Sequence, residues 1–362
     1  MNVRVLYISY VDAKASSSGS GVRPAKMLKA FREAGHELIV LSGNQAGKDR
    51  VQNVESALQE VRKRKPDLCY IESPTYPIMR HADRKLIQSI HRMGVPIGYF
   101  YRDFYRMFPE EFPGRKDFFG RCKDLGLNVL QALTDRCLYN CDIVYVPSAE
   151  AAHLLPYHDV RALPPAGENH LPLRKESNRT AIYVGGLRGQ YDIGLILDAF
   201  SDLNRAEQRY DLIIVCRKAE WERLEHPAKE QQWLHVYHVS GEELYSLYDR
   251  ASIAVSAKSG SRYNDFAVSV KTYEYMGFGL PQVVCEGKAV VPLIENEGIG
   301  LAVGRSKEDF AQAVQLLFAD RALYDRMQSR IRDSLLNRNL WTHRVETVVN
   351  DLTAGRKVKV DE

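Results

Sequence analysis

A lysine and a glutamate stand three positions apart near the start of a short predicted helix. The stretch SVKTYEYMGFGLPQVV, residues 269–284, places Lys271 and Glu274 one turn apart, directly after a loop rich in Ser, Gly, Arg and Asn. Backbone N–H groups and the macrodipole at a helix N-terminus attract anions, and Lys271 adds a full positive charge. Glu274, on roughly the same helix face, could accept both hydroxyls of a vicinal diol. A phosphate at Lys271 and a ribose at Glu274 describe a nucleotide, whereas a surface ion pair is the simpler interpretation.

Two glycine-rich stretches follow predicted strands and could also approach a ligand. YVGGLRGQ, residues 183–190, sets glycines around Arg188, and SSSGSGVR, residues 16–23, holds Gly19 and Gly21 ahead of another helix. Glycine lets the backbone come close to a ligand, and an arginine there can pair with a diphosphate. Neither stretch has the spacing of a dinucleotide fingerprint or a Walker loop. A plain tight turn is an equal interpretation of both.

Other catalytic and metal-binding patterns are missing from the sequence. There is no Ser–His–Asp order and no H-E-x-x-H, and no D-x-D is evident. His235 and His238 flank one predicted strand and point to opposite faces, so they make poor co-ligands. Cys137 and Cys141 form a C-x3-C with no second pair, which argues against zinc and for reduced, buried thiols in a cytoplasmic protein. We therefore expect no metal.

Strand and helix patterns alternate along the chain, which predicts parallel sheets with helices on both faces. The first series of predicted strands covers residues 3–10, 36–42, 68–73, 95–101 and 142–148. The second series covers residues 180–186, 210–216, 233–239, 251–257, 281–285 and 289–294. Helical patterns include one over about 125–139 and a long tail over about 306–352.

Length and composition fit two globular domains. The chain has 362 residues, more than a single core usually supports, and 45% of them are hydrophobic. The stretch LPPAGENHLPLRKESNR separates the two strand series and has the composition of a linker. We predict an α/β protein of two doubly wound, Rossmann-like domains facing a cleft. They cover residues 1–165 and 180–338, with a linker at 166–179.

Charge is uneven between the two halves. Residues 1–170 hold 24 Lys and Arg against 19 Asp and Glu, whereas the rest of the chain holds 26 against 27. A mildly basic first half fits an anionic partner such as a membrane surface or a phosphorylated acceptor, although solvated helix faces explain it as well. No apolar run approaches the ~20 residues that span a bilayer. The first ten residues alternate like a strand and lack the features of a signal peptide.

One aromatic and basic segment, residues 101–126, suits a membrane interface. Its rings could lie at the headgroup level while its cations face anionic lipid, or the rings could pack inward over an acceptor. The rings are those of Tyr101, Phe104, Tyr105, Phe108, Phe112, Phe118 and Phe119. The cations are those of Arg102, Arg106, Arg115, Lys116, Arg121 and Lys123.

Ligands of open α/β sheets bind beyond the carboxyl ends of the strands, where these loops lie. With the loops so placed, the sequence resembles a GT-B glycosyltransferase, close to the retaining family-four type. The resemblance is carried by residues 17–42, 181–203, 210–216, 234–257 and 269–284. The last of these stretches resembles the family variant in which a lysine precedes Glu-Tyr-Met and a glycine-proline turn. Trp341 lies in a segment that resembles the closing helix, here 339–362, that returns to the first domain.

The resemblance implies a nucleotide-sugar donor on the second domain and an acceptor on the first. Glu274 would hold the ribose, and Lys271 would lie near the ribose or the diphosphate. The implied donor site comprises Gly19, Gly21, Gly186, Arg188, Arg217, His238, Val239, Lys271, Thr272 and Glu274. The implied acceptor side comprises Arg102 and Asp103, and the residues expected to serve catalysis are Arg188, Lys271 and Asp103.

The sequence also departs from the family pattern. The family's usual second carboxylate stands eight positions before Glu274, where this chain has Phe266, with Asp265 one position off. The arginine expected after the first glycine turn is Gly186 here, so Arg188 would have to replace it. Arg217 stands where the family has Gly-x-Gly and could supply the missing diphosphate charge. These departures put the catalytic carboxylate in doubt.

We therefore predict a retaining glycosyltransferase that uses a UDP- or GDP-type sugar donor and no other cofactor. Its acceptor would be a glycan, a lipid-linked molecule or a protein, in surface polysaccharide or glycoconjugate synthesis, and not a nucleic acid. The predicted location is the cytoplasm. Peripheral contact with the inner face of the plasma membrane is left open. Three alternatives remain at this point: an inverting enzyme with Asp103 as base, a sugar-nucleotide epimerase of related fold, and a non-catalytic partner subunit.

Overall fold

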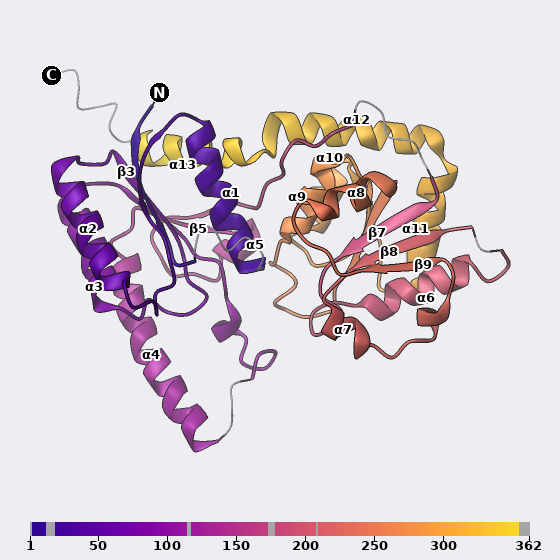
Figure 1. Cartoon of the computed structure of the whole chain (residues 1–362), viewed down its shortest axis with the longest axis horizontal. Helices are drawn as coiled ribbons and strands as arrows, with labels where there is room; N and C mark the ends of the chain where they lie inside the picture. The colour runs from indigo at the N-terminus through magenta and orange to yellow at the C-terminus, as the bar shows by residue number, and fades with distance from the viewer. Residues whose placement is uncertain (1, 12–18, 114–116, 173–177, 208, 355–362) are drawn as a thin grey trace. The chain divides into compact units, whose positions relative to one another are not determined.

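A computed structural model describes residues 2–11, 19–113, 117–172, 178–207 and 209–354 of the chain (Figure 1). The chain divides into two compact units. The first comprises Met1–Pro164 together with Trp341–Glu362, and the second comprises Pro165–Leu340. Each unit contains one six-stranded sheet. All six strands in each sheet pair in parallel.

The first sheet has the strand order β2-β1-β3-β4-β5-β6. Its strands are β1 Arg4–Ser9, β2 Glu37–Leu41, β3 Leu68–Glu72, β4 Ile97–Phe100, β5 Ile143–Val146 and β6 Val160–Ala162. Every residue of β3, β4 and β5 is buried, because helices cover both faces of a parallel sheet. The chain goes from β1 outward to β2 and then returns to β3 on the other side of β1. The carboxyl ends of β1 and β3 therefore form the topological switch point of this sheet.

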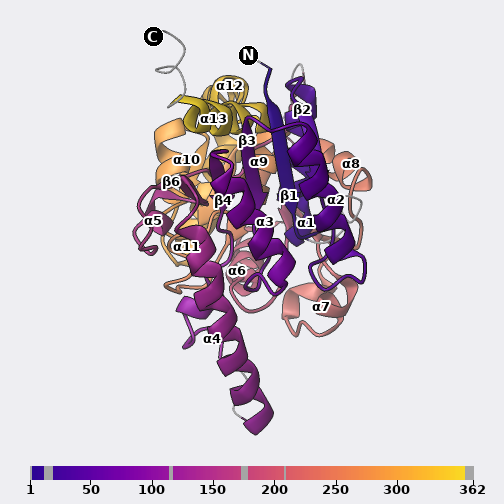
Figure 2. The same ribbon diagram turned by 90° about the vertical axis from the view of Figure 1, so that its left-hand side faces the viewer.

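The helices of the first unit are α1 Gly19–Glu33, α2 Arg50–Lys63, α3 His81–Arg92, η1 Tyr105–Met107, α4 Phe118–Leu138, α5 Ala149–Ala152 and α13 Trp341–Thr353. Helix α13 comes last in the chain but packs against α1. The C-terminal half of α4 is anchored, since the buried Thr134 hydroxyl accepts a hydrogen bond from the Ile78 N–H at 2.9 Å. Its N-terminal half projects away from the sheet (Figure 2).

The projecting half of α4 exposes large apolar side chains. Phe119 is 80% exposed, Leu125 67% and Val129 57%. In contrast, Phe104 and Phe108 of the preceding loop are buried, so part of the predicted aromatic surface belongs to the core. Arg115 and Lys116 lie outside the described residues. Within the described ranges, no helix combines the length and the apolar character needed to cross a membrane.

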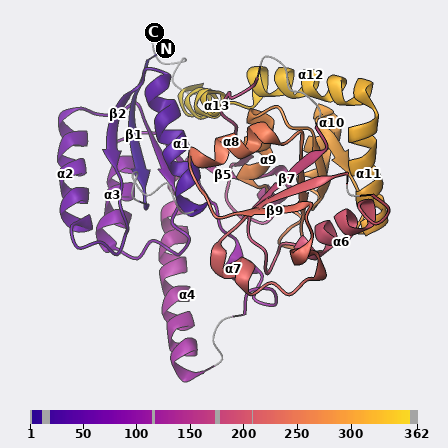
Figure 3. The same cartoon turned by 45° about the vertical axis from the view of Figure 1, so that its right-hand side comes forward.

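The second sheet has the strand order β12-β11-β10-β7-β8-β9. Its strands are β7 Thr180–Val184, β8 Asp211–Val215, β9 Leu234–Tyr237, β10 Ile253–Ala257, β11 Gln282–Cys285 and β12 Gly300–Ala302. Its helices are α6 Ile193–Leu203, α7 Lys218–Glu222, η2 Pro227–Glu230, α8 Glu243–Arg250, α9 Val270–Gly277, α10 Val291–Glu297, α11 Lys307–Ala319 and α12 Arg321–Arg338. Residues of α6 and α11 fill one core cluster and residues of α8 and α9 another, so both faces of the sheet are covered (Figure 3). The switch point of this sheet lies between β7 and β10, because the chain runs outward through β8 and β9 before returning beside β7.

The predicted pair of doubly wound α/β sheets is confirmed, with differences in single elements. Residues 289–294 were predicted as a strand, which is wrong: helix α10 begins at Val291, and the last strand is β12. Pro292 is tolerated there because the first turn of a helix needs no N–H from it. Helix α4 begins at Phe118 rather than near residue 125, and the three-residue β6 was not predicted. All six cysteines are free, but Cys122 is exposed rather than buried.

Candidate functional site

The first turn of α9 carries the lysine and the glutamate that the sequence singled out. Ser269 caps this helix, and its hydroxyl accepts a hydrogen bond from the Lys271 N–H at 3.2 Å. The Lys271 Nζ lies 2.6 Å from Glu274 Oε2, and the two side chains are 34% and 26% exposed. Thr272 faces the interior, where its carbonyl accepts a hydrogen bond from Gln282 Nε2 at 2.9 Å. The structure thus brings Lys271 and Glu274 together as a half-exposed ion pair.

Glu274 also influences a buried tyrosine. Burial, and then the neighbouring Glu274 carboxylate, raise the pKa of Tyr248 well above its usual value. Tyr248 therefore keeps its proton at neutral pH, with its hydroxyl close to the Glu274 carboxylate.

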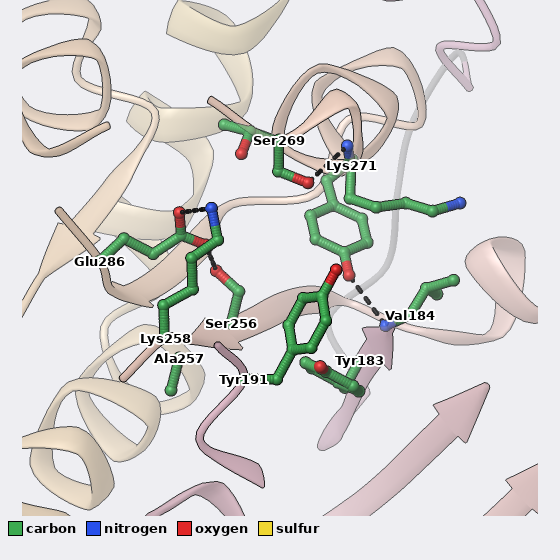
Figure 4. A pocket seen from close by; sticks show the side chains of 11 residues that line it. Tyr183, Val184, Tyr191, Ser256, Ala257, Lys258, Ser269, Lys271 and Glu286 are labelled. Carbon is green, nitrogen blue, oxygen red and sulfur yellow. Dashed lines mark hydrogen bonds and ion pairs between the residues drawn. The ribbon is translucent and has the colours of Figure 1, made fainter. Parts of the chain in front are cut away.

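A pocket opens beside the N-terminus of α9 (Figure 4) and encloses about 300 Å³, including its open mouth. It lies at the carboxyl ends of β7, β10 and β11, so it occupies the switch point of the second sheet. The pocket is lined by Tyr183, Val184, Tyr191, Ser256, Ala257, Lys258, Ser269, Lys271, Thr272, Tyr275 and Glu286. Of the predicted site residues, Lys271 and Thr272 line it, and Glu274 pairs with Lys271 at its edge.

A buried ion pair that the sequence reasoning missed forms one wall of the pocket. Lys258 Nζ lies 3.2 Å from Glu286 Oε2, and the two side chains are only 7% and 2% exposed. The Ser256 hydroxyl donates a hydrogen bond of 2.6 Å to Glu286 Oε1. The register of β10 and β11 pairs Ala257 with Cys285, so the residues that follow them come side by side. Charges this deeply buried are costly to maintain and mark candidate functional residues.

Tyrosines form the opposite part of the pocket lining. The Val184 N–H donates a hydrogen bond of 2.9 Å to the Tyr275 hydroxyl. Burial raises the pKa of Tyr275 and of Tyr183, so both hydroxyls stay neutral at physiological pH. A Cβ atom on Gly186 would lie 2.6 Å from the Tyr191 ring, so only glycine lets this ring pack against the turn. The glycine turn after β7 therefore shapes the pocket through the position of Tyr191.

The two predicted diphosphate arginines follow β7 and β8 but do not line the pocket. Arg188 is exposed, and its Nη2 donates a hydrogen bond of 3.0 Å to the Arg223 carbonyl. The Arg217 side chain is 80% exposed, with Nη1 at 3.0 Å from Glu220 Oε1. Glu220 also accepts a hydrogen bond of 2.8 Å from the Leu187 N–H, so this carboxylate connects the two loops.

Of the remaining predicted donor residues, His238 and Val239 follow β9. His238 Nδ1 lies 2.9 Å from the Cys216 carbonyl oxygen, and Val239 packs, partly buried, against a core cluster. His235 instead contacts Asp211 at 3.0 Å. Neither His238 nor Val239 lines the pocket.

The predicted residues of the first unit lie at the carboxyl ends of its strands. Gly19 and Gly21 form the first turn of α1, and the loop before them falls outside the described residues. Arg102 and Asp103 follow β4, with Arg102 Nε at 3.1 Å from Asp103 Oδ2. The Arg102 Nη2 also donates a hydrogen bond of 2.9 Å to the Thr75 hydroxyl. Asp103 is thus held by its neighbouring guanidinium.

The switch point of the first sheet also holds a buried ion pair that the sequence reasoning missed. Arg23 Nε lies 3.1 Å from Glu72 Oε1, with side-chain exposures of 5% and 1%. The guanidinium carbon lies 3.4 Å from the centre of the Phe100 ring. The Tyr70 hydroxyl donates a hydrogen bond of 2.8 Å to the same Glu72 oxygen. Both sheets therefore place a buried ion pair at the switch point.

Phe266 and Asp265, the residues at and beside the position eight before Glu274, do not line the pocket. Phe266 is buried, with its ring centre 5.1 Å from that of Tyr263. Asp265 is 40% exposed and pairs with Lys288 at 2.9 Å. Among the described residues, no three His, Cys, Asp or Glu side chains come together in a way that could hold a metal ion.

Known proteins resemble this chain in part of its sequence and in its fold. Residues 195–350, less than half of the chain, match the model of a family described as glycosyl transferase-like. No curated protein matches the sequence. The fold is similar to that of WaaG, a glycosyltransferase involved in lipopolysaccharide biosynthesis, with a TM-score of 0.62, 14% identity and coverage of 97% of this chain and 100% of that one.

Two further solved structures are similar over nearly the whole chain. One is an alpha-glucosyltransferase in complex with UDP and DNA, with a TM-score of 0.66, 12% identity and coverage of 98% of this chain and 100% of that one. The other is a putative UDP-N-acetylglucosamine 2-epimerase from Listeria monocytogenes, with a TM-score of 0.56, 11% identity and coverage of 99% and 98%. Identities this low show the fold alone. The chain has the two Rossmann-like domains of the GT-B fold, and its predicted resemblance to GT-B glycosyltransferases is confirmed.

Proposed function

We propose that the protein is a glycosyltransferase that transfers a sugar from a nucleotide-diphosphate donor bound to its second unit. The observation that carries the proposal is the Lys271–Glu274 pair at the N-terminus of α9, beside a pocket at the switch point of the sheet. A helix N-terminus and a lysine suit a diphosphate, and a nearby carboxylate suits a ribose diol. The match of residues 195–350 to a glycosyl transferase-like family supports the same assignment.

Donor binding would exchange the partners of this ion pair. In the structure Lys271 and Glu274 neutralise each other at 2.6 Å. A bound donor offers Lys271 a phosphate and Glu274 two ribose hydroxyls, so each side chain gains a ligand contact when the pair opens. The donor would be of the UDP or GDP type, and the UDP complex of a structural neighbour supports the first of these.

Transfer breaks the bond between the sugar C1 atom and a phosphate oxygen and forms a bond from C1 to an acceptor hydroxyl oxygen. Negative charge develops on the leaving diphosphate, which cationic side chains stabilise. Lys271, Arg188 and Arg217 are the residues proposed for this role, without a metal. The acceptor proton passes to the leaving phosphate if configuration is retained, which we favour. It passes to a base such as Asp103 if configuration is inverted.

The acceptor would bind on the first unit, near Arg102 and Asp103. We favour a glycan, a lipid-linked molecule or a protein, in surface polysaccharide or glycoconjugate synthesis, rather than a nucleic acid. The involvement of WaaG in lipopolysaccharide biosynthesis supports this choice. A cytoplasmic enzyme would meet such an acceptor at the inner membrane face.

Helix α4 is the element proposed to contact that membrane. Its projecting half exposes Phe119, Leu125 and Val129, and exposed cations Arg121 and Lys123 lie among them. Apolar side chains with flanking cations suit the headgroup region of an anionic bilayer. Sedimentation with anionic vesicles at low salt should bring the protein down, and Phe119→Ser should reduce the bound fraction. If the wild type stays in the supernatant, α4 does not bind membranes.

A sugar-nucleotide epimerase is the second candidate, because a putative epimerase shares the fold. A thermal-shift screen with UDP, GDP, ADP and their sugar conjugates tests the donor class, since ligands of the native state raise the unfolding midpoint. The same mixtures then separate the two activities. A transferase slowly hydrolyses its donor to free sugar and nucleoside diphosphate, whereas an epimerase converts the sugar without net loss of the conjugate. If no nucleotide raises the midpoint, both candidates fail.

A further inference from the structure

We infer that Glu286 binds the hydroxyl groups of the transferred sugar. The inference rests on the proposed function. It concerns a residue that no sequence motif marks, because Glu286 stands after β11 and not in the loop that leads into α9.

The order of groups in a sugar nucleotide indicates where its sugar would lie. The ribose and the sugar lie at opposite ends of the diphosphate. If the ribose lies at Glu274 and the diphosphate at the N-terminus of α9, the sugar must continue past that N-terminus. Figure 4 shows Lys271 on one side of the pocket, with its ammonium pointing away from Glu286, Lys258 and Ser256 on the other side. The sugar would therefore enter the part of the pocket that Glu286 lines.

The Glu286 carboxylate has unused capacity to accept hydrogen bonds. An ionised carboxylate offers about four lone-pair sites. Oε1 accepts one hydrogen bond, from Ser256. Oε2 accepts none from the described residues, although Lys258 Nζ lies 3.2 Å away as its ion-pair partner. A carboxylate that is 2% exposed and not fully hydrogen-bonded needs further donors, and sugar hydroxyls are donors of the right kind.

The surrounding backbone holds this carboxylate in place. A Cβ atom on Gly287 would lie 2.0 Å from the Asn264 carbonyl oxygen, so the 261–267 loop packs directly on the residue after Glu286. The Lys258 ammonium also lies 3.5 Å from the Ala267 carbonyl of the same loop. With Phe266 buried and Asp265 paired with Lys288, Glu286 is the carboxylate of this region that lines the pocket.

Calorimetry on the whole chain tests the inference with two ligands for each variant: the nucleoside diphosphate that binds best and its sugar conjugate. Glu286→Gln should weaken binding of the sugar conjugate about tenfold, equivalent to about 1.4 kcal/mol. Binding of the free diphosphate should stay within about twofold. The matched control is Glu297→Gln, which removes a carboxylate paired with Arg338 at 2.7 Å outside the pocket, and it should change neither affinity.

A second variant distinguishes a loss of sugar binding from a loss of stability. Glu286→Gln leaves Lys258 buried without a charged partner, which can destabilise the domain. The double variant Lys258→Met with Glu286→Gln removes both charges. Its affinity for the sugar conjugate, relative to the free diphosphate, should fall as much as that of the single variant. If the affinities for both ligands fall equally, the Lys258–Glu286 pair only supports the shape of the pocket. If neither affinity falls, Glu286 does not contact the ligand. If the wild type binds neither ligand, the proposed function itself is overturned.

Discussion

The substitution Glu274→Gln separates a ligand-binding carboxylate from a surface ion pair. Glutamine keeps the shape of the side chain, but it removes the charge that faces Lys271 at 2.6 Å. A half-exposed pair at this helical spacing stabilises a protein by about 0.3–0.5 kcal/mol. The free energy of unfolding should therefore fall by less than about 1 kcal/mol.

The effect on binding should be larger. Hydrogen bonds to an ionised carboxylate are roughly twice as strong as neutral ones and are worth about 1.5–3 kcal/mol each. Loss of the charge weakens two ribose contacts by about half, or about 1.5–3 kcal/mol together. The wild type also gives up its internal ion pair on binding, which offsets about 0.3–0.5 kcal/mol. The net loss of about 1–2.5 kcal/mol is a roughly 5- to 70-fold weaker affinity for the diphosphate.

Two measurements on the same preparation check this reasoning. Calorimetry with the best-binding nucleoside diphosphate gives the affinity, and urea unfolding gives the free energy of unfolding. Glu297→Gln again serves as the control, because its ion pair with Arg338 is also partly exposed but lies outside the site. An affinity within twofold of the wild type, with a small loss of stability, would reduce Glu274 to a surface residue.

Three further substitutions and one labelling reaction test other residues. Arg188→Ala and Arg217→Ala should each lower kcat more than they raise the donor KM, because charge on the leaving group grows in the transition state. A variant that turns over at the wild-type rate would show that its arginine does not stabilise the leaving group. Gly186→Ala should lower the free energy of unfolding by about 1–3 kcal/mol, because its Cβ would meet a tyrosine ring at 2.6 Å, and an unchanged urea midpoint would contradict this packing. A thiol reagent at pH 8 should label the exposed Cys122 first, since burial raises the pKa of Cys216 to about 11; equal rates on peptide mapping would contradict the burial.

Much of the fold could be predicted because its signals are local. The second-sheet strand β8, for example, carries four consecutive apolar residues after Asp211, and α9 begins at a serine cap and ends at a glycine turn. The error at residues 289–294 has the same origin. AVVPLI has the composition of a strand, but its proline stands in the first turn of a helix, where the local pattern cannot distinguish the two.

The site was only partly predictable because several of its contacts join residues far apart in the sequence. Lys271 and Glu274 are separated by one helical turn, so their spacing in the sequence reveals the pair. Lys258 and Glu286 come together through the register of two strands, and in the sequence each resembles a solvated residue at a strand end. From the sequence, Gly186 is predicted to let a ligand come close to the backbone. In the structure the Tyr191 ring packs against it. Such contacts can be recognised only once the pairing of the strands is known.

The proposed function requires that the second unit binds and activates a nucleotide-sugar. Phosphorus NMR on the whole chain, incubated with a panel of UDP- and GDP-sugars, follows the phosphate resonances of the donor and of its products directly. We expect one conjugate to be slowly converted to nucleoside diphosphate and free sugar, and Lys271→Met to slow this conversion at least tenfold. The experiment uses protein at a concentration comparable to that of the ligand. The proposed function would be contradicted if no conjugate is hydrolysed and if binding broadens the phosphate resonances of none.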